Sequence, residues 1–94
     1  MARAFWNGRL IAESDDIVVV EGHAYFPRGA VRSRYLAHSD KHTRCPWKGK
    51  ASFFSLVADG GRAEDAVWYY PRPWILARRI KDRVAFSGAV TVER

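Results

Sequence analysis

The chain has 94 residues, 48% of them hydrophobic and 14% aromatic, and its 16 Lys and Arg against 10 Asp and Glu give a formal net charge of +6. This length fits one domain, residues 1–94, and the apolar content excludes a disordered charged tail. No apolar run approaches the roughly 20 residues of a membrane span, and residues 1–10 lack a signal peptide's apolar segment. The single cysteine excludes an intramolecular disulfide and a Cys-only zinc site. We therefore expect a cytoplasmic domain that makes no contact with membranes.

The net charge is concentrated in one quarter of the chain, residues 28–50. This segment holds seven basic residues and one acidic residue, whereas the rest of the chain is neutral in sum. The basic residues are Arg28, Arg32, Arg34, Lys41, Arg44, Lys48 and Lys50. A positive segment attracts anionic partners such as phosphates, nucleic acid or acidic peptides, although a solvated basic face without a partner gives the same pattern.

The first third of the chain predicts short strands. Arg9–Glu13 and the β-branched segment Ile17–Glu21 are strand-like, and Asp15–Asp16 between them is a favourable turn, so we expect a hairpin. The second strand extends towards Pro27, which ends it. Ala30–Tyr35 predicts another short strand.

The remaining chain predicts a polar loop, a central hairpin, one helix and two closing strands. Ser39–Lys48 is polar and contains a proline, so we expect an ordered loop, and Pro73–Lys81 has the apolar spacing of a short helix. Strands are expected at Lys50–Ala58, Ala66–Tyr70, Val84–Phe86 and Ala89–Val92, with turns at Asp59–Gly61 and Ser87–Gly88. About six short strands and one C-terminal helix indicate a mainly-β fold, either a curled antiparallel sheet or a partly open barrel. The thin core and open sheet edges suit a monomer or a homodimer.

The densest group of reactive side chains lies in Ser39–Gly49. Cys45 follows Arg44 and precedes Lys48 by three residues, and a thiol among cationic groups is a candidate nucleophile. Lys48 is the candidate anchor for an anion. The alternative is structural, with Cys45 as a small buried hydrophobe, Trp47 as a core aromatic and Lys48 as a surface charge.

Two histidines lie close to the cysteine in the sequence. His38, His42 and Cys45 stand four and three positions apart, so on a helix their side chains would share one face and could bind a metal. Pro46 argues against a helix in this segment. No fourth ligand is evident apart from His23, so we expect no metal site and no cofactor. A Cys–His pair needs only two of these residues within hydrogen-bond distance, which makes His42 the candidate base for Cys45.

Glu21 is the carboxylate best placed for a site. It ends an apolar strand, where it can face a pocket and either pair with a basic side chain or act as a general base, and the pairing is the simpler role. Most aromatic residues are needed to fill the core, but Tyr69 and Tyr70 cannot both be buried on one face of a strand. No pattern of a known nucleic-acid-binding module is present, which argues against nucleic acid as the partner.

Several short motifs occur in order along nearly the whole chain. They are Trp6-x-Gly8, Glu21-Gly22-x-x-Tyr25-Phe26-Pro27, Ser39-x-x-x-Thr43-x-Cys45-Pro46-Trp47-Lys48-Gly49 and Trp68-x-Tyr70-Pro71-x-Pro73. Together they resemble the domain of unknown function 427 family, which also carries a nucleotidyltransferase label. The resemblance implies a small bacterial domain of mainly-β, Mss4-like architecture to which no activity is firmly attached.

The residues that recur in this family include most of the candidates above. In this chain they are Glu21, Tyr25, Ser39, Thr43, Cys45, Trp47, Lys48, Trp68 and Tyr70. The paired C-x-x-C motifs that hold zinc in Mss4-like proteins are absent here, so the resemblance does not carry the metal over. Metal-dependent nucleotidyl transfer needs two carboxylates one residue apart, and the chain has no D-x-D or D-x-E. Whether the domain is an enzyme therefore stays open.

The leading hypothesis is a module that binds a small anionic ligand, with weak catalysis as an extension of it. Lys48 and Arg44 would contact the anion from the Ser39–Gly49 loop, and Trp47 would stack on the ligand or seal it. The other ligand-binding candidates are Ser39, Thr43, Tyr25, Trp68 and Tyr70, with Glu21 as a further wall. The rivals are an enzyme with Cys45 as nucleophile and His42 as base, and a basic domain that binds nucleic acid or protein without a pocket.

Overall fold

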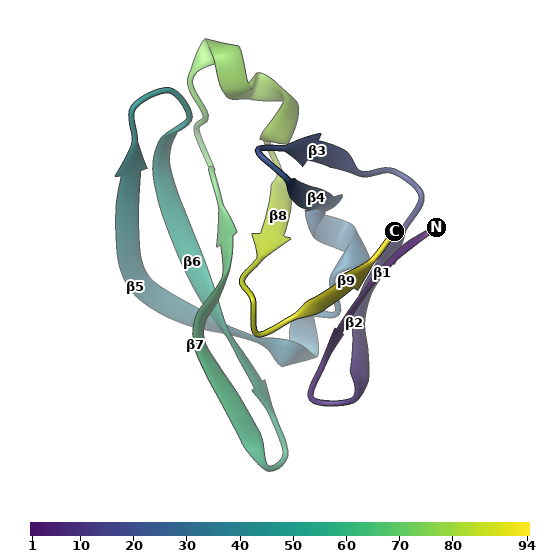
Figure 1. The fold of residues 1–94 in the computed structure, drawn as a ribbon. Helices are drawn as coiled ribbons and strands as arrows, with labels where there is room; N and C mark the ends of the chain where they lie inside the picture. The colour runs from purple at the N-terminus through teal and green to yellow at the C-terminus, as the bar shows by residue number, and fades with distance from the viewer.

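Nine strands and three short 3₁₀ helices make up the chain, and the computed structural model describes every residue from 1 to 94 (Figure 1). The strands are β1 (Ala2–Trp6), β2 (Arg9–Ser14), β3 (Val18–Val20), β4 (His23–Pro27), β5 (Leu36–Cys45), β6 (Gly49–Ala58), β7 (Gly61–Tyr69), β8 (Arg83–Phe86) and β9 (Thr91–Glu93). The 3₁₀ helices are η1 (Arg28–Ala30), η2 (Ser33–Tyr35) and η3 (Ile75–Ile80). None of these helices has the length and apolar content needed to cross a membrane.

The strands form two antiparallel sheets, neither of which closes into a barrel. A three-stranded sheet has the order β2-β1-β9, and a six-stranded sheet has the order β3-β4-β8-β7-β6-β5. In Figure 1 the long strands β5, β6 and β7 stand on one side of the molecule and the three-stranded sheet on the other. The mainly-β prediction is confirmed, and the open sheets agree with its curled-sheet form.

Tight turns built from left-handed residues join neighbouring strands. Asn7 and Gly8, between β1 and β2, have φ angles of 53° and 73°, and Glu21 and Gly22, between β3 and β4, have φ angles of 53° and 80°. Two successive positive φ angles give a turn whose twist matches that of antiparallel strands. The predicted central hairpin is also confirmed, because β6 and β7 pair on either side of a turn at Asp59–Gly60.

Two apolar clusters lie on opposite faces of the six-stranded sheet. The larger cluster has 15 buried residues drawn from both sheets, so it fills the space between them; Trp6, Ile11, Phe26 and Leu56 belong to it. The smaller cluster has 7 buried residues on the other face: Tyr25, Ala51, Phe53, Tyr70, Ala77, Ile80 and Ala85. Two of these seven come from η3, which therefore covers part of that face.

The pairing predicted for the first hairpin is wrong. Arg9–Glu13 lies in a strand, but this strand pairs with β1, which was not predicted, and Ile17–Glu21 contributes a strand that pairs with β4. Asn7–Gly8 is a stronger hairpin signal than Asp15–Asp16, because an Asn-Gly pair adopts the positive φ angles of a tight hairpin at low cost.

The segment predicted to be an ordered loop, Ser39–Lys48, is mostly strand. β5 continues to Cys45 and pairs with β6, so that only Pro46–Lys48 form the turn. β5 is an edge strand whose side chains are largely exposed, and its polar composition therefore does not prevent pairing. A bulge between His38 and His42 adjusts the register within it.

Three further elements differ from the prediction. Ala30–Tyr35 is not a strand but holds η2 and part of η1, linked to β2 by a single bridge. The helix expected at Pro73–Lys81 begins at Ile75, is of the 3₁₀ type, and is interrupted at Ala77, where φ is −115° and ψ is 15°. The turn after β8 leads to the other sheet, because β9 pairs with β1 and not with β8.

Candidate functional site

A cleft of about 370 Å³ opens on the face of the six-stranded sheet that carries the smaller apolar cluster. It combines one carboxylate, one ammonium group, one imidazole and the hydroxyls of Thr43 and Tyr70 with aromatic walls. The lining residues are Glu21, His23, Thr43, Lys48, Ala51, Phe53, Trp68 and Tyr70. These residues come from four strands and three turns or strand ends, so the cleft exists only in the folded sheet.

Strand alternation explains why these side chains share one face. Thr43 of β5 pairs with Ala51 of β6, and Phe53 of β6 pairs with Trp68 of β7. Directly paired residues of antiparallel strands project to the same side, and so do residues two apart on one strand. The floor of the cleft is thus set by the register of β5, β6 and β7.

Lys48 and Glu21 form an ion pair at one end of the cleft, between the β5–β6 turn and the β3–β4 turn. The Lys48 Nζ donates a hydrogen bond to Glu21 Oε1. Lys48 is only 8% exposed, whereas about half of the Glu21 side chain is exposed. The sequence-based prediction that Glu21 sits at a sheet rim and pairs with a basic residue is therefore confirmed.

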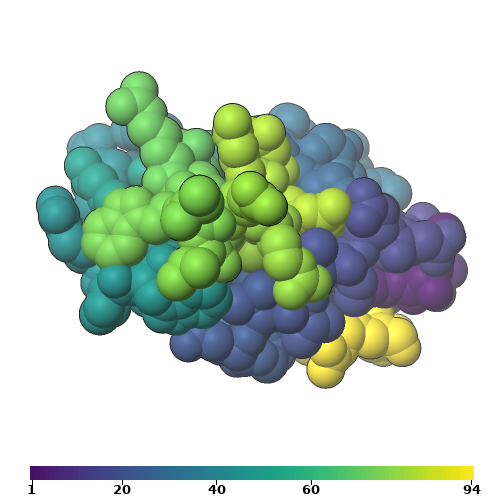
Figure 2. All heavy atoms as spheres, turned by 90° about the horizontal axis from the view of Figure 1, so that it is seen from above, coloured from purple at the N-terminus to yellow at the C-terminus, as the bar shows by residue number.

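The segment that leads into η3 holds the Lys48 turn in place. The Trp74 backbone N–H donates to the Lys48 carbonyl at 3.1 Å. Gly49 follows with a φ of 105°, and a Cβ at this position would lie 3.4 Å from the Arg72 carbonyl oxygen. Figure 2 shows this end of the molecule, where the green η3 segment lies beside the teal β5–β6 turn. The backbone on both sides of Lys48 is therefore fixed, and its ammonium group has a defined position.

The charges of the pair stabilise each other. The hydrogen bond from Lys48 lowers the pKa of Glu21, and this effect exceeds the opposing effect of burial. Burial acts to lower the pKa of Lys48, but the hydrogen bond to Glu21 and the neighbouring phenols and thiol raise it on balance. At neutral pH Lys48 is thus a charged ammonium group that is almost entirely withdrawn from solvent.

Aromatic rings surround this ammonium group. The Nζ of Lys48 lies 5.4 Å from the ring centroid of Trp47 and 5.7 Å from that of Tyr70, within the range of cation–π attraction. Burial raises the pKa of Tyr70. On the opposite wall, the Trp68 Nε1–H donates to the Tyr25 hydroxyl at 3.2 Å, and the His23 ring meets Trp68 edge-on at 4.9 Å between centroids.

The structure brings most of the sequence-predicted ligand-binding residues together. Five of them line the cleft: Glu21, Thr43, Lys48, Trp68 and Tyr70. Tyr25 and Trp47 contact the lining without belonging to it: buried Tyr25 accepts a hydrogen bond from Trp68, and exposed Trp47 lies beside the Lys48 ammonium group. Three lining residues were not predicted as ligand contacts: His23, Ala51 and Phe53. All three share a face with predicted residues, because His23 lies two residues before Tyr25, Ala51 is the cross-strand neighbour of Thr43, and Phe53 is that of Trp68.

Ser39 and Arg44, which were predicted to contact the ligand, do not lie in the cleft. The Ser39 hydroxyl donates to Asp65 across the sheet. Arg44 is exposed and neighbours Thr43 on the same strand, so the two side chains project to opposite faces. The hypothesis that Lys48 and Arg44 hold one anion together is therefore wrong, because β5 is a strand and not a loop that could gather both side chains.

Alternation also separates the predicted catalytic pair. His42 and Cys45 are three residues apart on a regular part of β5, so their side chains lie on opposite faces. His42 Nδ1 lies 3.2 Å from the Ser52 hydroxyl, and half-buried Cys45 packs against the smaller apolar cluster. His42 therefore cannot serve as the base for Cys45. His38 pairs with Asp40 at 2.9 Å, and no three His, Cys, Asp or Glu side chains converge as metal ligands.

Comparison with known families agrees with the motifs. The family described as "Domain of unknown function (DUF427)", with the short label NTP_transf_9, matches residues 1–94, the whole chain. The protein therefore belongs to this family. A search of curated proteins found no match.

Proposed function

We propose that this DUF427 domain binds a small anionic ligand in the cleft between Lys48 and the aromatic wall of Trp68 and Tyr70. The observation that carries the proposal is the buried ammonium group of Lys48, which borders an open cleft and has a single carboxylate partner. A buried charge is costly unless it is paired, and a partner that is half exposed can be exchanged for a ligand's anionic group.

The chemistry of the cleft suits an anionic head attached to a flat body. Thr43 and His23 supply further hydrogen-bonding groups to the same cleft, while Phe53, Trp68 and Tyr70 offer ring surfaces. Glu21 is the only carboxylate of the lining, and it opposes the approach of an anion unless it rotates towards solvent. Glu21 then has two effects: it keeps Lys48 charged and oriented while the cleft is free, and it competes with the ligand.

The proposal is tested by a thermal-shift screen of inorganic phosphate, nucleoside monophosphates, sugar phosphates and small carboxylates, followed by calorimetric titration of the best stabiliser. We expect Lys48→Met to weaken binding at least about tenfold, because a charge-assisted hydrogen bond is lost. Lys50→Met is the matched control, because it removes the same charge from an exposed residue that borders a different surface.

Glu21→Gln separates an anion from other ligand classes. If the ligand's anionic group replaces Glu21, this variant should bind more tightly than the wild type, because the competing charge is gone. Weaker binding by Glu21→Gln would assign the ligand's main contact to the carboxylate and would contradict an anionic ligand. The proposal would also be overturned if no compound in the screen stabilised the protein, or if Lys48→Met and Lys50→Met behaved alike.

A further inference from the structure

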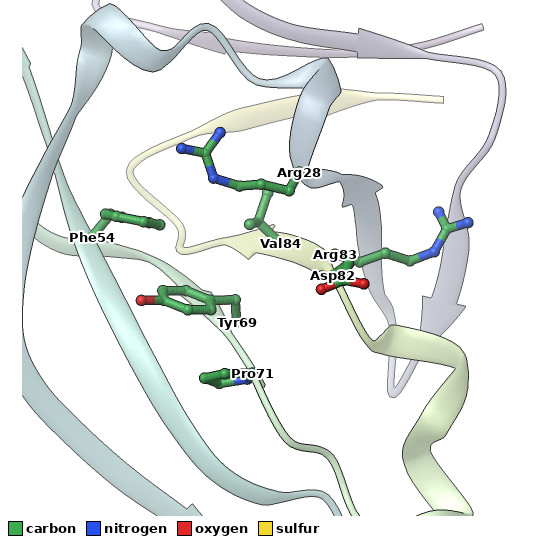
Figure 3. A pocket seen from close by; sticks show the side chains of 7 residues that line it. All are labelled: Arg28, Phe54, Tyr69, Pro71, Asp82, Arg83 and Val84. Carbon is green, nitrogen blue, oxygen red and sulfur yellow. The ribbon is translucent and has the colours of Figure 1, made fainter.

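A second cleft, of about 190 Å³, lies on the opposite face of the six-stranded sheet (Figure 3). Its lining residues are Arg28, Phe54, Tyr69, Pro71, Asp82, Arg83 and Val84. None of them belongs to the Lys48 cleft, and none was a candidate from the sequence. The volume is below the roughly 300 Å³ at which pockets for drug-sized ligands begin, so it suits a ligand with a single ring.

The two clefts lie back to back because aromatic residues occur in consecutive pairs on β6 and β7. Phe53 and Trp68 face the Lys48 cleft, and their chain neighbours Phe54 and Tyr69 face the second one. The rings of Phe54 and Tyr69 stack at 4.9 Å between centroids and 19° between planes. Both are only half-buried, so the exposed parts of the stacked rings form an apolar wall that a ligand can contact.

Arg28 holds an unpaired guanidinium group over this wall. Its Cζ lies 5.3 Å from the centroid of the Phe54 ring, and no carboxylate lies within ion-pair distance of it. The Arg28 backbone is fixed, because its N–H donates to the Asp82 carbonyl at 2.9 Å. A guanidinium group in this position can bind a carboxylate through two parallel hydrogen bonds while remaining stacked on the ring.

Of the other two charged groups in the lining, Arg83 is occupied by another residue and Asp82 is left to contact the ligand. Arg83 is already engaged, since its guanidinium donates to Asp16 Oδ1 at 3.0 Å, and Figure 3 shows it directed away from the aromatic wall. The Asp82 carboxylate makes no ion pair and lies across Val84 from the guanidinium of Arg28 in Figure 3. Asp82 repels a dianion and accepts a hydrogen bond from a neutral donor.

We propose that the second cleft binds a one-ring aromatic monocarboxylate that carries a hydrogen-bond donor, such as a hydroxyl or amino group, away from its carboxylate. The ring packs against Phe54 and Tyr69, the carboxylate binds Arg28, and the donor binds Asp82. This site is independent of the Lys48 cleft, because the sheet separates the two sets of lining side chains.

The test is an NMR titration of the ¹⁵N-labelled protein with 4-hydroxybenzoate. We expect saturable shifts of the backbone amides around Phe54, Tyr69 and Val84, with little change around Lys48. On the unmodified protein, 4-hydroxybenzamide, which lacks the carboxylate, should bind at least about tenfold more weakly. Benzoate, which lacks the donor, should also bind more weakly, and Asp82→Asn, whose amide oxygen still accepts a hydrogen bond but carries no charge, should reduce that difference.

Two variants complete the design. Arg28→Met should weaken binding of 4-hydroxybenzoate at least about tenfold, whereas Arg32→Met, an exposed neighbour with the same loss of charge, should change it less than twofold. The proposal would be overturned by the absence of saturable shifts, by shifts confined to the Lys48 cleft, or by equal binding of the acid and the amide. The comparison of 4-hydroxybenzoate with 4-hydroxybenzamide uses the unmodified protein, so it tests the proposal even if Arg28→Met does not fold.

Discussion

Tyr25→Phe removes one atom that positions the Trp68 wall of the Lys48 cleft. The Tyr25 side chain is 1% exposed, and its hydroxyl accepts the indole N–H of half-buried Trp68 at 3.2 Å. A neutral hydrogen bond contributes about 0.5–1.5 kcal/mol net to stability. The Trp68 N–H can reach water once its partner is gone, so we expect the lower part of that range, about 0.5–1 kcal/mol. This corresponds to a fall in Tm of roughly 2–8 °C for a domain of this size.

A double-mutant cycle isolates this bond from other consequences of the substitution. Tyr25→Phe, Trp68→Phe and the double variant are compared by chemical denaturation, and the coupling free energy between the two positions measures the bond itself. The indole ¹H–¹⁵N signal of Trp68 should also exchange faster with solvent in Tyr25→Phe. A coupling below about 0.3 kcal/mol would refute the reasoning, because that is the scatter expected of independent sites.

Three further outcomes follow from the same region. Lys48 lowers the pKa of Glu21 from 4.5, so the ionised pair adds stability above that pH and loses it as the pH falls through the lowered value. Unfolding midpoints measured between pH 7 and pH 3 should therefore decline less in Glu21→Gln than in the wild type. Parallel curves for the two proteins would contradict this. Gly49→Ala should cost about 1–3 kcal/mol in urea unfolding because its φ is 105°, whereas Gly29→Ala, whose Cβ would meet open space, should be nearly neutral. Iodoacetamide should label half-buried Cys45 more slowly in the native protein than in denaturant, and fast native labelling would revive the nucleophile hypothesis.

The β-rich fold follows from the sequence because its signals are local. The β-branched segment at residues 17–20 and the apolar run of β6 each predict a strand without reference to the rest of the chain. Pairing partners are not local. β9 at residues 91–93 pairs with β1 at the other end of the chain, and no nearby residue indicates this. The Asn7–Gly8 turn is the exception, since its two residue types alone would have predicted the β1–β2 hairpin.

The candidate site was predictable as a set of residues but not as a geometry. Glu21, Lys48, Trp68 and Tyr70 were selected by their motifs, and the sheet gathers them although Glu21 and Tyr70 stand 49 positions apart in the chain. Arg44 was selected for its charge and was wrongly placed in the site, because its polar segment was predicted to be a loop. An edge strand can be as polar as a loop. Once β5 is known to be a strand, alternation alone removes Arg44 from the cleft.

The three-residue strand β9 protects an edge that is otherwise open. All three of its residues are exposed, and it pairs only with β1, whose Ala2, Ala4 and Trp6 belong to the larger core. So short and solvated a strand is among the first parts of a fold to open in local fluctuations. Each opening uncovers the backbone N–H and C=O groups of β1, to which β9 of a second molecule can add in an antiparallel manner. Such an exchange would link two molecules through their β9 strands.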